Sequence, residues 1–189
     1  EVWNGAFPQA KYFQQQGLAL NLSTKPLLAQ LFYYSLRATQ VADIFRGVFG
    51  TGSGGTTTGA GPAFEMVACM QAANVYTGEQ VLGFKPDGKT NASAWFDRFA
   101  WAPYFKWSFP SHESNTAKAA MLQSWSLEQL LRNVTDSLPV TAGWSRQNAA
   151  LAQAHGLKVG TYESGQGLVI GPPTYNNATL IATFAAANR

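Results

Sequence analysis

The chain has 189 residues, enough for one domain or for a piece of a larger one. Only 12% of the residues are charged and 46% are hydrophobic, which disfavours disorder and is typical of a secreted carbohydrate-active protein. The net charge of +3 comes from scattered basic residues, which argues against nucleic-acid binding, and no apolar run is long enough to cross a membrane. We therefore expect an extracellular protein without a membrane or nucleic-acid partner.

The first half of the sequence predicts two helices and then a strand–helix pair. We expect a short helix over about 7–16 and a longer one over about 26–48, where apolar residues recur at helical spacing. The Gly- and Thr-rich stretch 51–62 is predicted to be a flexible surface loop. A buried strand over 63–70 and a helix over 72–84 should follow.

The second half predicts further strands and helices in alternation. A strand is expected over 98–105, with Pro103 near its end, where the missing N–H is tolerated. Helical segments over 116–138 and 141–155 precede a short strand that leads to Glu163, and a small alanine-rich helix lies in the tail. Strands that alternate with helices indicate an α/β fold built from parallel β/α units. Three complete strands are too few for a closed barrel.

Glu163 is the best placed of the ten carboxylates for chemistry. It ends a short strand, and in β/α folds ligands bind at the carboxyl ends of the strands. Glu65 and Asp97 precede strands, which is the wrong end. Glu1 is the only other carboxylate that could end a strand. Two histidines and one cysteine, Cys69, which we expect to be buried, do not support a metal site, and no cofactor is expected.

Three motifs carry a resemblance to a known family: Glu1-Val2-Trp3-Asn4, Ala102-Pro103-Tyr104-Phe105 and Tyr162-Glu163-Ser164-Gly165. Together they resemble the second half of a retaining (β/α)8-barrel glycoside hydrolase, especially the cellulase-like or cellulose-binding proteins of bacteria and phages. The resemblance implies a partial (β/α)8 TIM barrel, running roughly from the end of strand 4 through helix 7. Residues 1–189 would then be a single fragment, the carboxyl-terminal half of a catalytic domain. The family's Glu-Gly-Gly element is Glu-Ser-Gly here, and the family's Asn before the first glutamate would precede residue 1.

The activity implied by this resemblance is hydrolysis of a β-linked polysaccharide by double displacement with retention. Glu163 would be the nucleophile and Glu1 the acid/base, with their carboxyl groups about 5–5.5 Å apart. Tyr104 would hydrogen-bond Glu163 and hold it ionised and oriented. Trp101 is a candidate for stacking on sugar rings, and the implied substrate-binding positions are Tyr104, Trp3, Asn4, Trp107 and Tyr162.

Two other interpretations stay open. A non-catalytic carbohydrate-binding protein could keep the same barrel and its aromatic residues, and the distance between Glu1 and Glu163 would distinguish it from an enzyme. An unrelated secreted α/β protein with an accidental motif match is the third. An isolated half-barrel would expose a sheet face, so the fragment alone is expected to be inactive and to self-associate. Its other partner would be the polysaccharide or oligosaccharide substrate.

Overall fold

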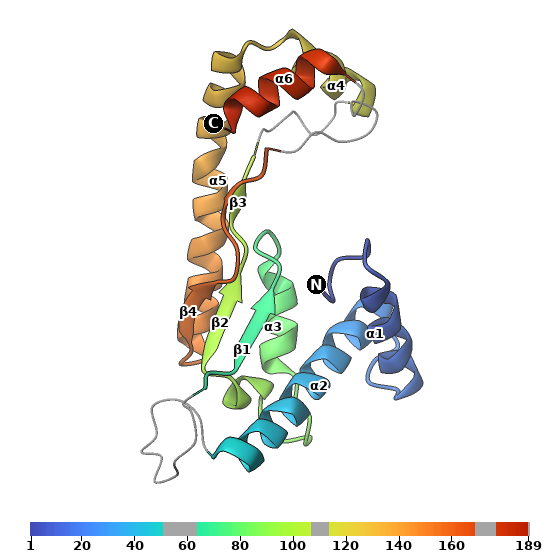
Figure 1. Ribbon diagram of the computed structural model, residues 1–189. Coiled ribbons are helices and arrows are strands. Elements are labelled where there is room, and N and C mark those ends of the chain that lie inside the picture. Colours follow the sequence, from blue (N-terminus) through green and yellow to red (C-terminus); the bar gives the residue numbers. More distant parts are fainter. Residues whose placement is uncertain (51–63, 107–113, 169–176, 189) are drawn as a thin grey trace. The chain divides into compact units, whose positions relative to one another are not determined.

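The computed structural model describes residues 1–50, 64–106, 114–168 and 177–188 (Figure 1). These residues form a mixed α/β protein in which helices predominate and the strands pair in parallel. They fall into two compact units. Unit 1 comprises Glu1–Ala102 and Trp144–Tyr162, and unit 2 comprises Pro103–Gly143 and Glu163–Arg189.

Unit 1 is built on a three-stranded parallel sheet. Its strands are β1 (Val67–Met70), β2 (Arg98–Trp101) and β4 (Lys158–Thr161), and β2 lies between the other two. The predicted parallel pairing is therefore confirmed for this sheet. Because the strands are parallel, their carboxyl ends lie along one edge.

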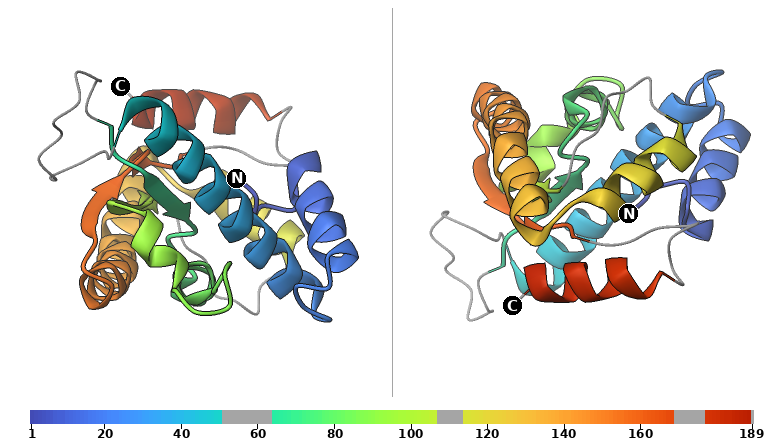
Figure 2. Two further views of the ribbon diagram at one scale, coloured as in Figure 1. Left: turned by 90° about the horizontal axis from the view of Figure 1, so that it is seen from below. Right: turned by 90° about the horizontal axis from the view of Figure 1, so that it is seen from above.

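Four helices and the last part of a fifth complete unit 1. They are α1 (Pro8–Ala19), α2 (Pro26–Phe49), α3 (Val75–Gly83), the short 3-10 helix η1 (Ala92–Trp95) and the end of α5 (Leu127–Ala154). Both α1 and α2 begin with proline, whose fixed φ and missing N–H suit the first helical position. Figure 2 shows α1 lying against α2 in both views. The helices approach closely at Gly17, where a Cβ would lie 2.0 Å from the Ala29 carbonyl oxygen.

The core of unit 1 lies between the sheet and these helices. Phe99 of β2 is fully buried, and Gly78 of α3 packs so closely that a Cβ there would lie 2.7 Å from the Phe99 ring. The other buried core residues are Leu31, Ala68, Met70, Ala72, Val81, Leu82, Ala92, Phe96, Trp101 and Ala152. The small residues in this set let the helices pack directly against the strands.

The edge of β1 that does not face β2 is covered by a side chain of α2. The backbone N–H of Cys69 donates to the hydroxyl of Tyr34 over 3.2 Å. Burial raises the pKa of Tyr34 to about 12. Cys69 itself is only half-buried, so the prediction that it is buried was wrong; the odd-numbered positions of β1 point away from the core, with Val67 exposed and Ala68 and Met70 buried.

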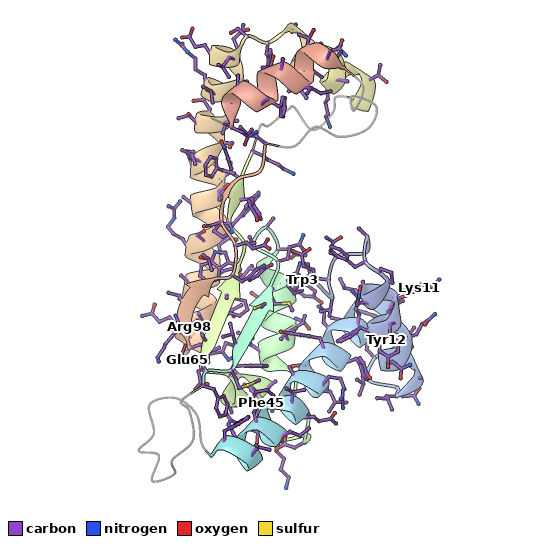
Figure 3. The ribbon with its side chains drawn as sticks, viewed as in Figure 1. Trp3, Lys11, Tyr12, Phe45, Glu65 and Arg98 are labelled. Carbon is purple, nitrogen blue, oxygen red and sulfur yellow. The ribbon has the colours of Figure 1, made fainter. Side chains whose placement is uncertain are left out.

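An ion-pair cluster lies at the amino-terminal end of the same sheet. Glu65 accepts hydrogen bonds from Arg98 at 2.9 and 3.0 Å and from Lys158 at 2.6 Å (Figure 3). Each partner begins one strand, so the cluster joins the starts of all three strands. Glu65 therefore lies at the amino-terminal end of the sheet, as predicted, whereas Glu163 follows the carboxyl-terminal end of β4.

Unit 2 is mainly helical. It contains α4 (Asn115–Ser124), α5 up to Gly143 and α6 (Ala178–Ala187), together with a two-residue parallel pair formed by β3 (Tyr104–Phe105) and β5 (Gly165–Gln166). Its core consists of Leu122, Leu130, Val134, Leu168, Leu180 and Phe184. Phe105 packs against this core and ties β3 to it.

Several boundaries differ from the sequence predictions. The helical segment expected over 116–138 is divided at residues 125–126 between α4 and α5. The strand expected over 98–105 is divided into β2 and β3, which pair with different partners. The break expected between 138 and 141 is absent, because α5 continues through Pro139. No closed barrel occurs among the described residues, and the predicted loop 51–62 lies outside them. In the described part of the chain, no helix combines the length and apolar character that a membrane span requires.

Candidate functional site

Glu163 is an exposed side chain that follows the last residue of β4 by two positions. The strand therefore ends two residues earlier than predicted, and Glu163 lies just beyond its carboxyl end instead of being its last residue. The chain bends at residues 162 and 163 and enters β5 at Gly165. This places the carboxylate in a turn between two strand pairings rather than within a strand.

The hydroxyl of Tyr104 donates a hydrogen bond to Oε2 of Glu163 over 2.9 Å. This is the contact that the family resemblance predicted, and the structure confirms it. A hydrogen bond to an ionised carboxylate is stronger than one between neutral groups, and its direction orients the carboxyl group. Tyr104 is 39% exposed, so the pair lies at the surface of unit 2, within reach of a ligand.

Gly165 makes the turn after Glu163 possible. Its φ is +121°, a backbone conformation that side-chain-bearing residues rarely adopt. The same residue pairs with Tyr104 in the β3–β5 ladder. The glycine therefore links the backbone that carries the acid to the backbone that carries its hydrogen-bond donor.

The two paired segments differ by one residue beside Glu163. Trp101 pairs with Thr161, and Tyr104 pairs with Gly165. Two residues (102–103) separate Trp101 from Tyr104, whereas three (162–164) separate Thr161 from Gly165. The extra residue lies in the bend after β4 and not within a strand, because the two pairings belong to separate sheets. Sequence analysis missed this feature, although the Ser-Gly after Glu163 signalled a turn.

A further contact to this site comes from α5. The buried side chain of Thr141 donates from Oγ1 to the backbone carbonyl of Tyr104 over 3.3 Å. Sequence analysis did not single out Thr141, and nothing in the local pattern marks it, because its partner lies 37 positions away along the chain. Figure 1 shows β3 running beside α5, which brings the two residues together.

Glu1 belongs to unit 1, where its carboxylate has a local partner. The side-chain amide of Asn4 donates to Oε2 of Glu1 over 2.8 Å. The side-chain amide of Gln30 on α2 donates to the Val2 carbonyl and holds this segment on the helix. The structure thus brings together Glu1 with Asn4, and Glu163 with Tyr104. Because the two pairs lie in different units, the separation of the carboxyl groups stays a prediction.

The predicted aromatic contacts have mixed outcomes. Trp3 and Tyr162 lie near each other in unit 1, with ring centroids 6.4 Å apart, and both are half-buried. Trp101 was a candidate for sugar stacking with core packing as the favoured alternative; it is only 4% exposed and its indole N–H donates to Ser145 over 3.3 Å, so it packs in the core. Trp107 lies outside the described residues.

No group of three metal-ligating side chains occurs among the described residues. Comparison with protein-family models, with curated proteins and with solved structures found no match to this chain. The site consists of an exposed carboxylate that accepts a hydrogen bond from a tyrosine, in a turn with a glycine at positive φ.

Proposed function

We propose that the chain is part of the (β/α)8-barrel catalytic domain of a retaining glycoside hydrolase acting on a β-linked polysaccharide outside the cell. The observation that carries this proposal is the 2.9 Å hydrogen bond from Tyr104 to Glu163 beyond the end of β4. A carboxylate nucleophile has to be ionised, oriented and accessible. The tyrosine hydrogen bond orients the Glu163 carboxylate, and the exposure of this side chain makes it accessible.

The strand order supports the barrel. Strands of the unit 1 sheet are neighbours in the order in which they occur along the chain, β1-β2-β4, with helices between them. A barrel keeps this order throughout, whereas a doubly wound sheet reverses it at a switch point. Residues at the carboxyl ends of barrel strands carry the chemistry, and Glu163 follows such an end.

In the proposed mechanism, Glu163 attacks the anomeric carbon and forms a covalent glycosyl–enzyme intermediate. Tyr104 holds Oε2, which leaves the other carboxyl oxygen to act as the attacking atom. Glu1 protonates the departing glycosidic oxygen and then removes a proton from the water that releases the sugar. The Asn4 amide would orient the Glu1 carboxyl group. Trp3, Asn4, Trp107, Tyr162 and Tyr104 would contact the substrate, and the two-carboxylate reaction requires no cofactor.

The decisive experiment compares Glu163→Gln, Glu1→Gln and a control, Glu79→Gln, in the longest natural form of the protein. Glu79 is an exposed glutamate of α3, so the control removes one surface charge without touching the site. The two site variants should lose on the order of 10⁴-fold or more in kcat/KM on β-linked glucans or related polymers, whereas Glu79→Gln should not. A 2-fluoro glycoside should label the wild-type protein covalently at position 163.

A fully active Glu163→Gln variant would end the nucleophile assignment. If neither the wild type nor the variants hydrolyse a panel of β-linked polymers but all bind one of them, the protein is a carbohydrate-binding protein instead. Binding is measured by affinity electrophoresis in gels that contain the polymer.

A further inference from the structure

We propose that Thr141 is a positioning residue of the Glu163 site, an assignment that rests on the function proposed above. Its hydroxyl fixes the backbone of Tyr104, and so fixes the position from which the tyrosine hydroxyl binds the nucleophile. Thr141 touches neither Glu163 nor a substrate by this contact. It acts through Tyr104 alone.

The direction of the Thr141 hydroxyl distinguishes it from other helical threonines of the chain. Threonine hydroxyls in helices commonly bond to the carbonyl three or four positions earlier. Thr39, Thr135 and Thr183 do so, at 2.9 to 3.0 Å. Thr141 donates instead to a carbonyl outside α5, on β3. A buried hydroxyl that forgoes its local acceptor serves a tertiary contact.

Tyr104 lies on a strand that offers its backbone only a short ladder. The strand β3 has two residues, and its neighbour Pro103 has no N–H with which to extend the ladder. In addition to the β3–β5 ladder, two of the described contacts hold this strand. Phe105 packs against the unit 2 core, and the N–H of Gly167 donates to the Phe105 carbonyl over 2.7 Å. Both act at Phe105. Thr141 is the contact from the helix that acts on Tyr104 itself.

Loss of this restraint has a measurable consequence because the Tyr104–Glu163 hydrogen bond is directional. A displacement of about 1 Å would take the 2.9 Å contact outside hydrogen-bonding range. A misplacement of that size in a catalytic group lowers the rate by up to about 100-fold. Because the hydrogen bond from Tyr104 orients the nucleophile for the chemical step, the loss should appear more in kcat than in KM.

The experiment uses the full chain labelled with ¹³C at glutamate carboxyl carbons. The sequence has six glutamates, so six resonances are expected, and Glu163→Gln identifies that of Glu163. Tyr104→Phe should move this resonance, and Thr141→Val should move it in the same direction by at least half as much. Thr141→Ser, which keeps the hydroxyl, should restore the wild-type position. The control is Thr135→Val on the same helix, whose hydroxyl bonds to Leu131, and it should have no effect.

Thr141→Ala serves as the second variant if Thr141→Val does not fold, because alanine also lacks the hydroxyl and favours the helix. An unchanged Glu163 resonance in a folded Thr141 variant, with a moved resonance in Tyr104→Phe, overturns the assignment. So does an unchanged resonance in Tyr104→Phe. These readouts need no enzymatic turnover, so they separate a failure of the Thr141 assignment from a failure of the proposed function, which depends on Glu163→Gln activity.

Discussion

Replacing Gly165 by alanine should release the Glu163 turn while leaving the rest of the protein folded. The φ of +121° at Gly165 is disfavoured for any residue with a Cβ, and holding alanine there requires about 1–3 kcal/mol. The backbone hydrogen bonds of the β3–β5 pair each contribute about 0.5–1.5 kcal/mol. The strain thus matches what holds this two-residue pair together. Gly165→Ala should therefore separate β5 from β3 locally instead of unfolding unit 2, whose core does not include Gly165.

Amide hydrogen exchange measures this release directly at position 167, whose N–H donates to the Phe105 carbonyl over 2.7 Å. A strain of about 1–3 kcal/mol should raise the exchange rate of this amide by about 5- to 150-fold through local opening. The ¹³C carboxyl resonance of Glu163 should move together with it. Amides in the α1–α2 pair of unit 1 should keep their protection.

Gly167→Ala is the matched control for this prediction. It lies two residues along the same segment, its φ is not positive, and a Cβ there would meet its nearest atom at 3.6 Å, an ordinary contact. Both variants lose one glycine, so the difference between them isolates the positive φ. If Gly165→Ala and Gly167→Ala show the same exchange rates and the same Glu163 resonance, the argument that glycine is required in this turn is refuted.

Three further predictions concern unit 1. Gly17→Ala should destabilise the chain by more than about 3 kcal/mol in urea unfolding, because its Cβ would lie 2.0 Å from a backbone atom of α2. The control Gly47→Ala, which has open space around it, should stabilise the chain by about 1 kcal/mol. Equal effects of the two substitutions would contradict the close packing of α1 on α2. The pKa of about 12 for Tyr34, against about 10 unfolded, means that stability present below pH 10 falls by about 3 kcal/mol as the pH rises to 12. A Tyr34→Phe variant should lack this part of the loss of stability at alkaline pH. If the wild type and the variant lose stability identically between pH 10 and 12, Tyr34 does not contribute to the loss. Hydrogen bonds from Lys158 and Arg98 hold the pKa of Glu65 below its usual value, so its stabilisation is present above about pH 4.3 and is lost as the pH falls through the lowered pKa. The difference in unfolding free energy between wild type and Glu65→Gln should therefore shrink in acid, and a difference that persists at pH 2 would speak against the ion-pair cluster.

Local signals were enough to locate the helices that have clear ends. The helix predicted over 26–48 is α2, Pro26–Phe49. Its start is fixed by a proline at the first helical position, and its end by Gly50, which has a φ of +84°. Both signals are properties of single residues, so they can be read from sequence alone.

The helix break expected near Pro139 shows where local signals fail. A proline inside a helix removes one hydrogen bond and disfavours the helix by about 3 kcal/mol, and Pro139 lies between the two segments that were expected to be separate helices. The helix α5 nevertheless continues, and residues on both sides of the proline, Leu130, Val134 and Ala152, are buried in cores. Burial of a Leu or Val side chain stabilises the folded chain by about 1.5–3 kcal/mol, so the burial of several such residues exceeds the penalty of the proline. Sequence pattern does not show which residues receive that burial.

The site itself was predictable only in part, for a related reason. The strand-end glutamate and the Ser-Gly turn could be read from the sequence, and the family resemblance supplied Tyr104 as the donor. The shift of register beside Glu163 could not be read, because it depends on which residues of two distant segments pair. Thr141 is a contact of the same kind, since its acceptor is a backbone carbonyl that has no sequence signature.

The contacts around Glu163 show how a small set of interactions can fix one carboxylate in an exposed turn. Tyr104 binds its oxygen, Gly165 sets the backbone that follows it, and Thr141 restrains the tyrosine. Each comes from a different element of unit 2, so no single helix or strand positions the acid. An exposed glutamate with a merely solvating role would need none of these three contacts, and it would tolerate alanine at position 165. Tyr104 contacts the carboxylate, while Gly165 and Thr141 act on the backbone around it, and our proposal of a chemical function for Glu163 rests on this arrangement.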